Sequence, residues 1–259
     1  MSRQKLGQHF LVNPAILEKI AKAVSPEGED LVIEIGPGRG ALTEMLLRRA
    51  ARVIAIEVDR DMVAHLREKF AGETRLEIVH ADVLMTDLGQ WGSAPIAGNL
   101  PYYITSPILE KTVCLDMPRL IFLMQKEVAE RLVAVPGTRE YGYLTLQTRL
   151  FAEAKLLFDV KPGAFRPPPR VDSSVVMLTP RQVDMGAVDR KAFLRFLSTS
   201  FRQKRKTLRN NLSALYGREI VDGWPEAGLR AEQLTLEQFE EMFRRLTPIT
   251  EDQDSRRNS

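Results

Sequence analysis

Short apolar segments alternate with helical segments through the first half of the chain, and this rhythm restricts the fold more than any other feature. We expect strands over residues 31–35, 52–56, 75–79, 94–98 and 120–124, with helices between them, as over 15–24 and 41–51. Strands that alternate with helices form a parallel sheet with right-handed crossovers. A helix over 143–153 and strands over 154–160 and 174–178 would complete a mostly parallel, seven-stranded α/β sheet.

The pattern changes after residue 180, where helical periodicity and turn signals continue without a convincing strand. We therefore expect an α/β domain over residues 1–180 and a small all-α domain over 190–250, joined by a linker around 180–189. Residues 251–259 carry no apolar side chain and are expected to form a disordered tail.

Composition excludes several classes of protein. The chain has 259 residues, of which 44% are hydrophobic and 27% charged. No apolar run approaches the ~20 residues that span a bilayer, and no signal-peptide segment follows Met1. One cysteine excludes an internal disulfide, and three histidines without ligand spacing predict no metal site. We expect a cytoplasmic protein with no membrane segment, and a monomer because the sequence offers no spare apolar face.

The net charge of +3 lies entirely in the last third of the chain, where residues 181–259 hold 15 Lys and Arg against 12 Asp and Glu. One segment there, residues 201–209, has five basic residues and no acidic one: Arg202, Lys204, Arg205, Lys206 and Arg209. Such a cluster favours a polyanionic partner. A solvated helix face is the alternative that charge alone leaves open.

A glycine-rich turn and acidic residues at strand ends indicate a nucleoside site. Gly36, Gly38 and Gly40 follow the first expected strand and let the backbone approach a ligand. Glu57 ends the second strand, where it can accept hydrogen bonds from both ribose hydroxyls, and Asp82 follows the third, where it can accept one from an adenine amine. The turn lacks P-loop residues and dinucleotide-motif spacing, so S-adenosylmethionine fits better than NAD. Taken singly, each residue could belong to a tight turn or a helix cap.

The segment Gly98-Asn-Leu-Pro-Tyr-Tyr103 supplies further groups at the same edge of the sheet. The Asn99 side-chain oxygen can accept a hydrogen bond from an amino group, as can a backbone carbonyl held outward by Pro101. Tyr102 can stack on a flat heterocycle. An ordinary turn is the alternative for this segment alone, because Asn, Pro and Gly are common turn residues.

Five motifs resemble, in order, those of the ribosomal RNA adenine dimethyltransferases, and among these the bacterial small-subunit family linked to kasugamycin sensitivity. They are Gln8-His-Phe-Leu11, Glu34-Ile-Gly-Pro-Gly38, Asn99-Leu-Pro-Tyr102, Phe165-Arg-Pro-Pro-Pro-Arg-Val-Asp-Ser173 and Phe201-Arg-Gln-Lys-Arg-Lys-Thr-Leu-Arg209. The resemblance implies a Rossmann-like class I methyltransferase domain with S-adenosylmethionine as donor. It also implies N6,N6-dimethylation of two adjacent adenosines in a hairpin near the 3′ end of 16S rRNA, during small-subunit assembly.

By position, the resemblance assigns donor binding to His9, Leu11, Gly36, Gly38, Glu57, Asp82 and Asn99. The expected catalytic residues are Asn99, Leu100, Pro101, Tyr102 and Phe165. In this hypothesis the amine of a flipped adenine donates to the Asn99 oxygen and the Leu100 carbonyl, while Tyr102 and Phe165 stack on its two faces. Ordinary packing beside the proline turn is the alternative for Phe165. A basic helix over residues 201–209 would contact RNA phosphates, with Arg3, Lys5, Arg166 and Arg170 as auxiliaries.

Two other functions stay open from the sequence. One is an N6-adenine methyltransferase that acts on 23S rRNA or DNA, because the large-subunit methylases share the expected fold and pocket. The other is an RNA-binding assembly factor in which catalysis is dispensable.

Overall fold

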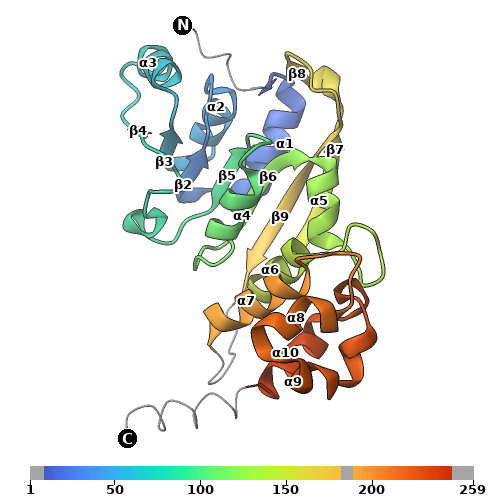
Figure 1. Ribbon diagram of the computed structural model, residues 1–259. Coiled ribbons are helices and arrows are strands. Elements are labelled where there is room, and N and C mark those ends of the chain that lie inside the picture. Colours follow the sequence, from blue (N-terminus) through green and yellow to red (C-terminus); the bar gives the residue numbers. More distant parts are fainter. Residues whose placement is uncertain (1–8, 182–188, 247–259) are drawn as a thin grey trace, which may run out of the picture. The chain divides into compact units, whose positions relative to one another are not determined.

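Seven strands pair into one sheet in the order β4-β3-β2-β5-β6-β9-β7 (Figure 1). They are β2 (Glu29–Ile35), β3 (Ala50–Glu57), β4 (Leu76–His80), β5 (Ile96–Asn99), β6 (Leu120–Gln125), β7 (Ala152–Val160) and β9 (Ser173–Pro180). The pairs among the first five strands are parallel, and β9 runs antiparallel to both of its neighbours. The predicted mostly parallel, seven-stranded sheet is therefore confirmed. Its central strands are mostly apolar because both of their faces are buried, and Glu34 of β2 is an exception.

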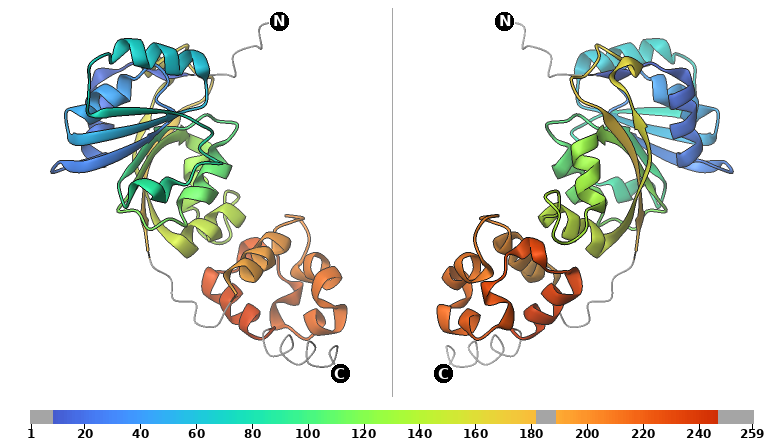
Figure 2. Two further views of the ribbon diagram at one scale, coloured as in Figure 1. Left: turned by 90° about the vertical axis from the view of Figure 1, so that its left-hand side faces the viewer. Right: turned by 90° about the vertical axis from the view of Figure 1, so that its right-hand side faces the viewer.

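The computed structural model describes residues 9–181 and 189–246. The chain divides into a first unit, residues 1–133 with 151–181, and a second unit, residues 134–150 with 182–259 (Figure 2). The prediction placed residues 134–150 in the first domain. They belong to the second unit instead, where the buried Tyr141 hydroxyl donates to the Leu234 carbonyl at 2.7 Å. Most of the expected linker and the whole expected tail lie outside the described residues.

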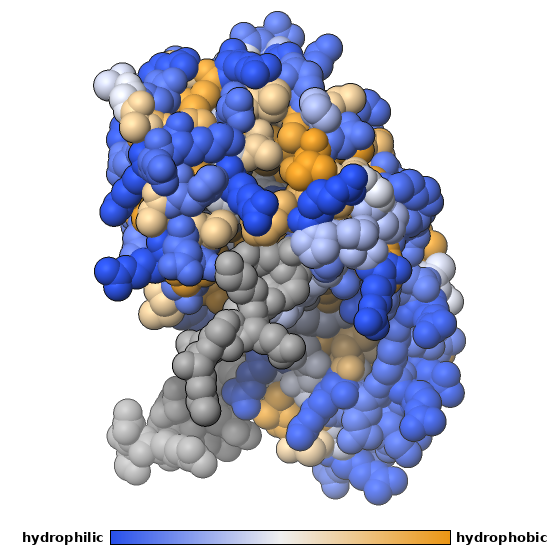
Figure 3. Space-filling model, turned by 90° about the horizontal axis from the view of Figure 1, so that it is seen from above, coloured by the Kyte–Doolittle hydropathy of each residue, from blue (hydrophilic) through white to orange (hydrophobic). Residues whose placement is uncertain are grey.

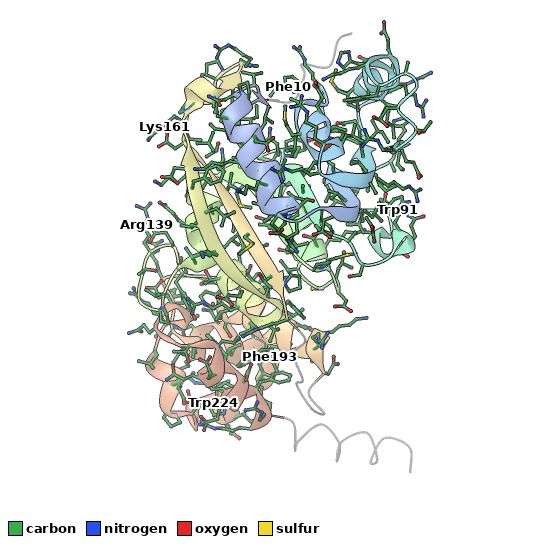
Figure 4. The ribbon with its side chains drawn as sticks, turned by 180° about the vertical axis from the view of Figure 1, so that it is seen from behind. Phe10, Trp91, Arg139, Lys161, Phe193 and Trp224 are labelled. Atoms are coloured by element: carbon green, nitrogen blue, oxygen red, sulfur yellow. The ribbon has the colours of Figure 1, made fainter. Side chains whose placement is uncertain are left out.

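Helices cover both faces of the sheet in the first unit, as the opposite views of Figures 1 and 4 show. They are α1 (Pro14–Val24), α2 (Ala41–Leu47), α3 (Arg60–Lys69), α4 (Thr105–Thr112) and α5 (Lys126–Val133). The Asn13 side chain caps α1 by accepting from the Ile16 amide, as Asn before Pro predicts. The helix predicted over 41–51 ends at Leu47, because Ala50 already pairs with Glu29 at the start of β3.

A second, two-stranded sheet joins the beginning of the described chain to the proline-rich loop. In it β1 (Phe10–Leu11) runs antiparallel to β8 (Phe165–Arg166). The sequence did not predict this pair, because strands of two residues have no readable period. The Val12 amide continues the attachment by donating to the Ala164 carbonyl at 2.9 Å.

The second unit is helical in its described part. Its helices are α6 (Tyr143–Phe151), α7 (Arg190–Ser200), α8 (Leu208–Tyr216), α9 (Arg218–Asp222) and α10 (Leu236–Arg244). The last residue of α6, Phe151, already belongs to the first unit. Aromatic rings form its core: Phe196 lies within 6.3 Å of both Phe193 and Trp224, centroid to centroid (both labelled in Figure 4). No helix among the described residues is long and apolar enough to span a bilayer.

Candidate active site

The carboxyl ends of four adjacent parallel strands meet at one edge of the large sheet. Ile35 pairs with Ile56 of β3 and with Gly98 of β5, and Glu57 pairs with His80 of β4. The strand order reverses between β2 and β5, because the chain passes outward through β3 and β4 before it returns to β5. Open α/β sheets bind ligands at such a switch point.

A cavity at this edge brings together the residues that the sequence assigned to donor binding and most of those assigned to catalysis. Its lining includes His9, Leu11, Gly36, Gly38, Glu57, Asp82, Asn99, Leu100, Pro101 and Tyr102. Large apolar side chains of the lining are exposed: Val58 is 56% and Tyr103 is 57% exposed. The view from above shows hydrophobic side chains among hydrophilic ones on that side of the molecule (Figure 3). Within the described part of the chain, no group of three or more His, Cys, Asp and Glu side chains could hold a metal ion.

The glycine turn folds back on the Glu57 carboxylate. Gly38 has φ +55°, and its amide donates to Glu57 Oε2 at 3.1 Å. A Cβ on Gly38 would stand 2.9 Å from the Phe10 ring, so a larger residue there would have to displace that ring and adopt a positive φ that favours glycine. Gly40 serves packing instead, because a Cβ there would stand 2.6 Å from Phe70.

Two carboxylates line the cavity in different environments. Glu57 is only 5% exposed, and its Oε1 accepts from the Asp59 amide at 2.9 Å. Each Glu57 oxygen is thus oriented by one amide and keeps capacity to accept a second hydrogen bond. Asp82 is exposed, and its Oδ1 accepts from the Leu84 amide at 2.9 Å. The apolar side chain of Val83 lines the same cavity beside Asp82.

Glu34, for which the sequence motifs predict no role, lines the cavity too. It is 1% exposed, and Thr43 Oγ1 of α2 donates to its Oε2 at 2.6 Å. Burial raises the pKa of Glu34 to about 7; the Thr43 hydrogen bond opposes that rise, and the Glu57 charge adds to it. A carboxyl within an otherwise apolar strand is the sequence signal for such a residue, because a buried carboxyl requires either a hydrogen-bonding partner or a proton.

Asn99, Leu100 and Tyr102 form the other end of the cavity. Asn99 Nδ2 donates to the His9 carbonyl at 2.9 Å. Among the described residues the carbonyl of Leu100 accepts no hydrogen bond, whereas the amide of Leu100 donates to the Leu123 carbonyl at 2.9 Å. The Tyr102 hydroxyl lies 3.0 Å from Ser173 Oγ, which fixes the edge of the ring, and burial raises the pKa of Tyr102.

Phe165, the predicted second stacking face, does not line the cavity in this structure. The residue is completely buried and packs in the core with Leu11, Leu17 and Val175. Its pairing with Leu11 across the two-stranded sheet directs both side chains inward. The alternative of ordinary packing therefore describes Phe165.

The basic segment of residues 201–209 is not a helix, which corrects the prediction. Residues 201–206 form turns, and α8 begins only at Leu208. The Asn211 side chain stabilises these turns: Oδ1 accepts from the Gln203 amide at 3.1 Å, and Nδ2 donates to the Ser200 carbonyl at 2.8 Å.

The five basic residues of this segment are exposed, four of them in the turns and Arg209 in the first turn of α8: Arg202, Lys204, Arg205, Lys206 and Arg209. Two of them have partners within the second unit, since Lys204 donates to the Arg139 carbonyl and Arg209 pairs with Asp222. Of the expected auxiliaries, Arg166 and Arg170 are exposed. Arg3 and Lys5 lie outside the described residues.

The chain is similar to proteins that modify ribosomal RNA. A family model described as "Ribosomal RNA adenine dimethylase" matches residues 1–248. "Ribosomal RNA small subunit methyltransferase A" of Acidobacterium capsulatum is 42% identical over 257 residues, which cover 94% of this chain and 91% of that protein. The protein of the same name from Chlorobium phaeobacteroides is 41% identical, over 95% of this chain and 94% of its own.

Solved structures agree with this similarity. A dimethyladenosine transferase from Plasmodium falciparum superposes with a TM-score of 0.76 and 27% identity, covering 90% of this chain and 96% of that one. The 23S rRNA methyltransferase ErmE superposes with a TM-score of 0.67 and 26% identity, covering 92% and 99%. The fold of the first unit is accordingly that of the Rossmann-like methyltransferases.

Proposed function

This chain belongs to the ribosomal RNA adenine dimethylase family, and from that membership we propose that it transfers methyl groups from S-adenosylmethionine to 16S rRNA. The acceptors are the N6 amines of two adjacent adenosines in the 3′-terminal hairpin, and the product is N6,N6-dimethyladenosine, formed during small-subunit biogenesis. Relatives named for the small subunit, more than 40% identical over nearly the whole chain, support this choice. The observation that carries it is the single cavity that Gly36, Glu57, Asp82 and Asn99 line together.

The residues around the glycine turn suit S-adenosylmethionine, which when bound supplies a methyl group on an electrophilic sulfonium. Glu57 presents two pre-oriented carboxylate oxygens, which suit acceptance from the two hydroxyls of a ribose. Asp82 is free enough to accept from the amine of an adenine, and Val83 offers that ring an apolar wall. Leu11, Gly36 and Gly38 complete the donor end of the cavity, whereas His9 contacts Asn99 at the acceptor end.

The acceptor end suits an amine whose lone pair must be oriented toward the methyl donor rather than made more reactive by a base. An adenine amine is a weak nucleophile, because its lone pair is delocalised into the ring. The Asn99 oxygen and the Leu100 carbonyl would each accept one N–H and direct the lone pair toward the donor, so positioning supplies most of the acceleration. Pro101 supports this geometry, since it has no amide hydrogen and holds the turn. The adenine must first flip out of the RNA helix. Tyr102 would then stack on it, and this stacking is worth ~1–3 kcal/mol.

The exposed basic loop of the second unit suits the phosphates of the RNA. Arg202, Lys204, Arg205 and Lys206 are exposed in this loop, and Arg209 is exposed at the start of α8. Arg209 contributes less because it already pairs with Asp222. We infer further that the protein acts as a monomer in the cytoplasm, on 16S rRNA within a precursor of the small subunit.

The test compares methyl incorporation from labelled S-adenosylmethionine into small-subunit particles, 23S rRNA and duplex DNA. We expect incorporation only into the small subunit, at N6 of two adjacent adenosines, as located by mass spectrometry of its rRNA. Incorporation into 23S rRNA instead would favour the activity that the name of ErmE describes. A Glu57→Ala variant that loses methylation but fully supports subunit assembly would favour the assembly-factor function.

A further inference from the structure

His9 ties the beginning of the described chain to the acceptor end of the cavity through three contacts. Its backbone carbonyl accepts from Asn99 Nδ2 at 2.9 Å. Its ring Nδ1 lies 2.8 Å from the Pro167 carbonyl oxygen, and its ring centroid lies 5.7 Å from that of Tyr102. A carbonyl oxygen can only accept, so Nδ1 carries the proton and donates to Pro167.

The carbonyl contact decides which atom of the Asn99 amide is available to a ligand. A carboxamide is planar, and its nitrogen and oxygen point in different directions from the same carbon. Because the nitrogen is held by His9, the oxygen is turned away from His9. Among the described residues that oxygen accepts no hydrogen bond, and Asn99 lines the cavity. The side chain is therefore set to accept from an amine and not to donate.

The imidazole contact holds that carbonyl in place. Strand pairing between β1 and β8 begins at Phe10, opposite Arg166, and so stops one residue short of His9. The hydrogen bond from His9 Nδ1 to Pro167 extends the attachment by one residue on each side. Without it, the His9 carbonyl is held only by the Asn99 hydrogen bond itself and by the strand pairing that begins at Phe10, so the Asn99 amide has a less firmly fixed partner.

We propose that His9 is a positioning residue for methyl transfer: by donating to Pro167 it holds its carbonyl against Asn99 and keeps the Asn99 oxygen turned toward the target amine. The inference rests on the proposed function. It gives the imidazole no contact with the reacting atoms and no part in proton transfer.

Two substitutions form a matched pair that separates the hydrogen bond from the bulk of the ring. In His9→Asn the amide nitrogen stands the same number of bonds from the backbone as Nδ1 and can donate to Pro167. In His9→Leu a branched side chain of similar size cannot donate. With small-subunit RNA and S-adenosylmethionine both saturating, we expect His9→Asn to keep kcat within about twofold and His9→Leu to lose about tenfold. The donor dissociation constant should change by less than about twofold in both.

Each other result overturns the inference in an identifiable way. A wild-type kcat in His9→Leu would remove the role of the hydrogen bond. Equal losses in both variants would assign the function to the ring itself, as a wall against Tyr102. A changed pH profile of kcat in His9→Asn would make the imidazole a proton acceptor, and a large loss of donor affinity would make it a donor-binding residue. A wild-type enzyme that does not methylate the small subunit would instead overturn the proposed function, which keeps the two failures distinguishable.

Discussion

Glu34 should make the folded protein less stable as the pH rises from about 4.5 to about 7. Its carboxyl is buried under α2, and its pKa is raised to about 7 from an ordinary value of 4.5. In this pH window the folded protein holds a proton that the unfolded chain has already lost, so the free energy of unfolding falls with increasing pH. One pKa unit corresponds to about 1.4 kcal/mol, and the full shift therefore corresponds to an upper value of about 3 kcal/mol above pH 7.

The Glu34→Gln variant isolates this contribution. Its side-chain carbonyl can still accept from Thr43, but it cannot ionise, so it should gain about 2–3 kcal/mol of stability over wild type between pH 5 and pH 8. Urea unfolding at half-unit pH steps measures the difference. Glu44→Gln, an exposed change on α2, is the control and should show no comparable trend. A difference between Glu34→Gln and wild type that stays constant with pH would refute the reasoning.

Three further predictions concern the cavity and the basic loop. Asn99→Ala should abolish methyl transfer, because the amide oxygen accepts a hydrogen bond from the target amine. The donor dissociation constant, measured by calorimetry, should stay within about threefold of wild type. Near-normal turnover would contradict this prediction. Gly38→Ala should weaken donor binding about tenfold, since its Cβ would stand 2.9 Å from Phe10 at a φ of +55°. An unchanged donor dissociation constant in the same titration would show that the contact between Gly38 and Phe10 does not shape the donor site. Lys206→Gln should reduce the slope of log affinity against log salt for RNA by about one, and a wild-type slope would place Lys206 away from phosphate.

The sheet and its ligand-binding edge were readable from the sequence because both depend on local patterns. Apolar runs such as residues 31–35 are buried on both faces, and right-handed crossovers then place their ends together. Glu57 and Asn99 could be assigned to one edge without knowledge of any contact, since each directly ends a parallel strand.

Features that depend on distant partners could not be read in this way. Phe165 faces inward because it pairs with Leu11, a partner that no local pattern shows. The basic segment was predicted as a helix from its composition, whereas the Asn211 side chain holds it in turns. No local pattern predicts a role for Glu34, since its burial follows from α2 packing across it.

The attachment of His9 to Pro167 joins positions 158 residues apart in the chain. During synthesis His9 leaves the ribosome long before its partner does, so the glycine turn, Glu57 and Asn99 can fold into their sheet while the closing strand still has nothing to pair with. A growing chain that stops short of the proline loop therefore carries the residues that line the cavity, but it lacks the partner strand of β1 and also β9, the neighbour of β6 in the large sheet.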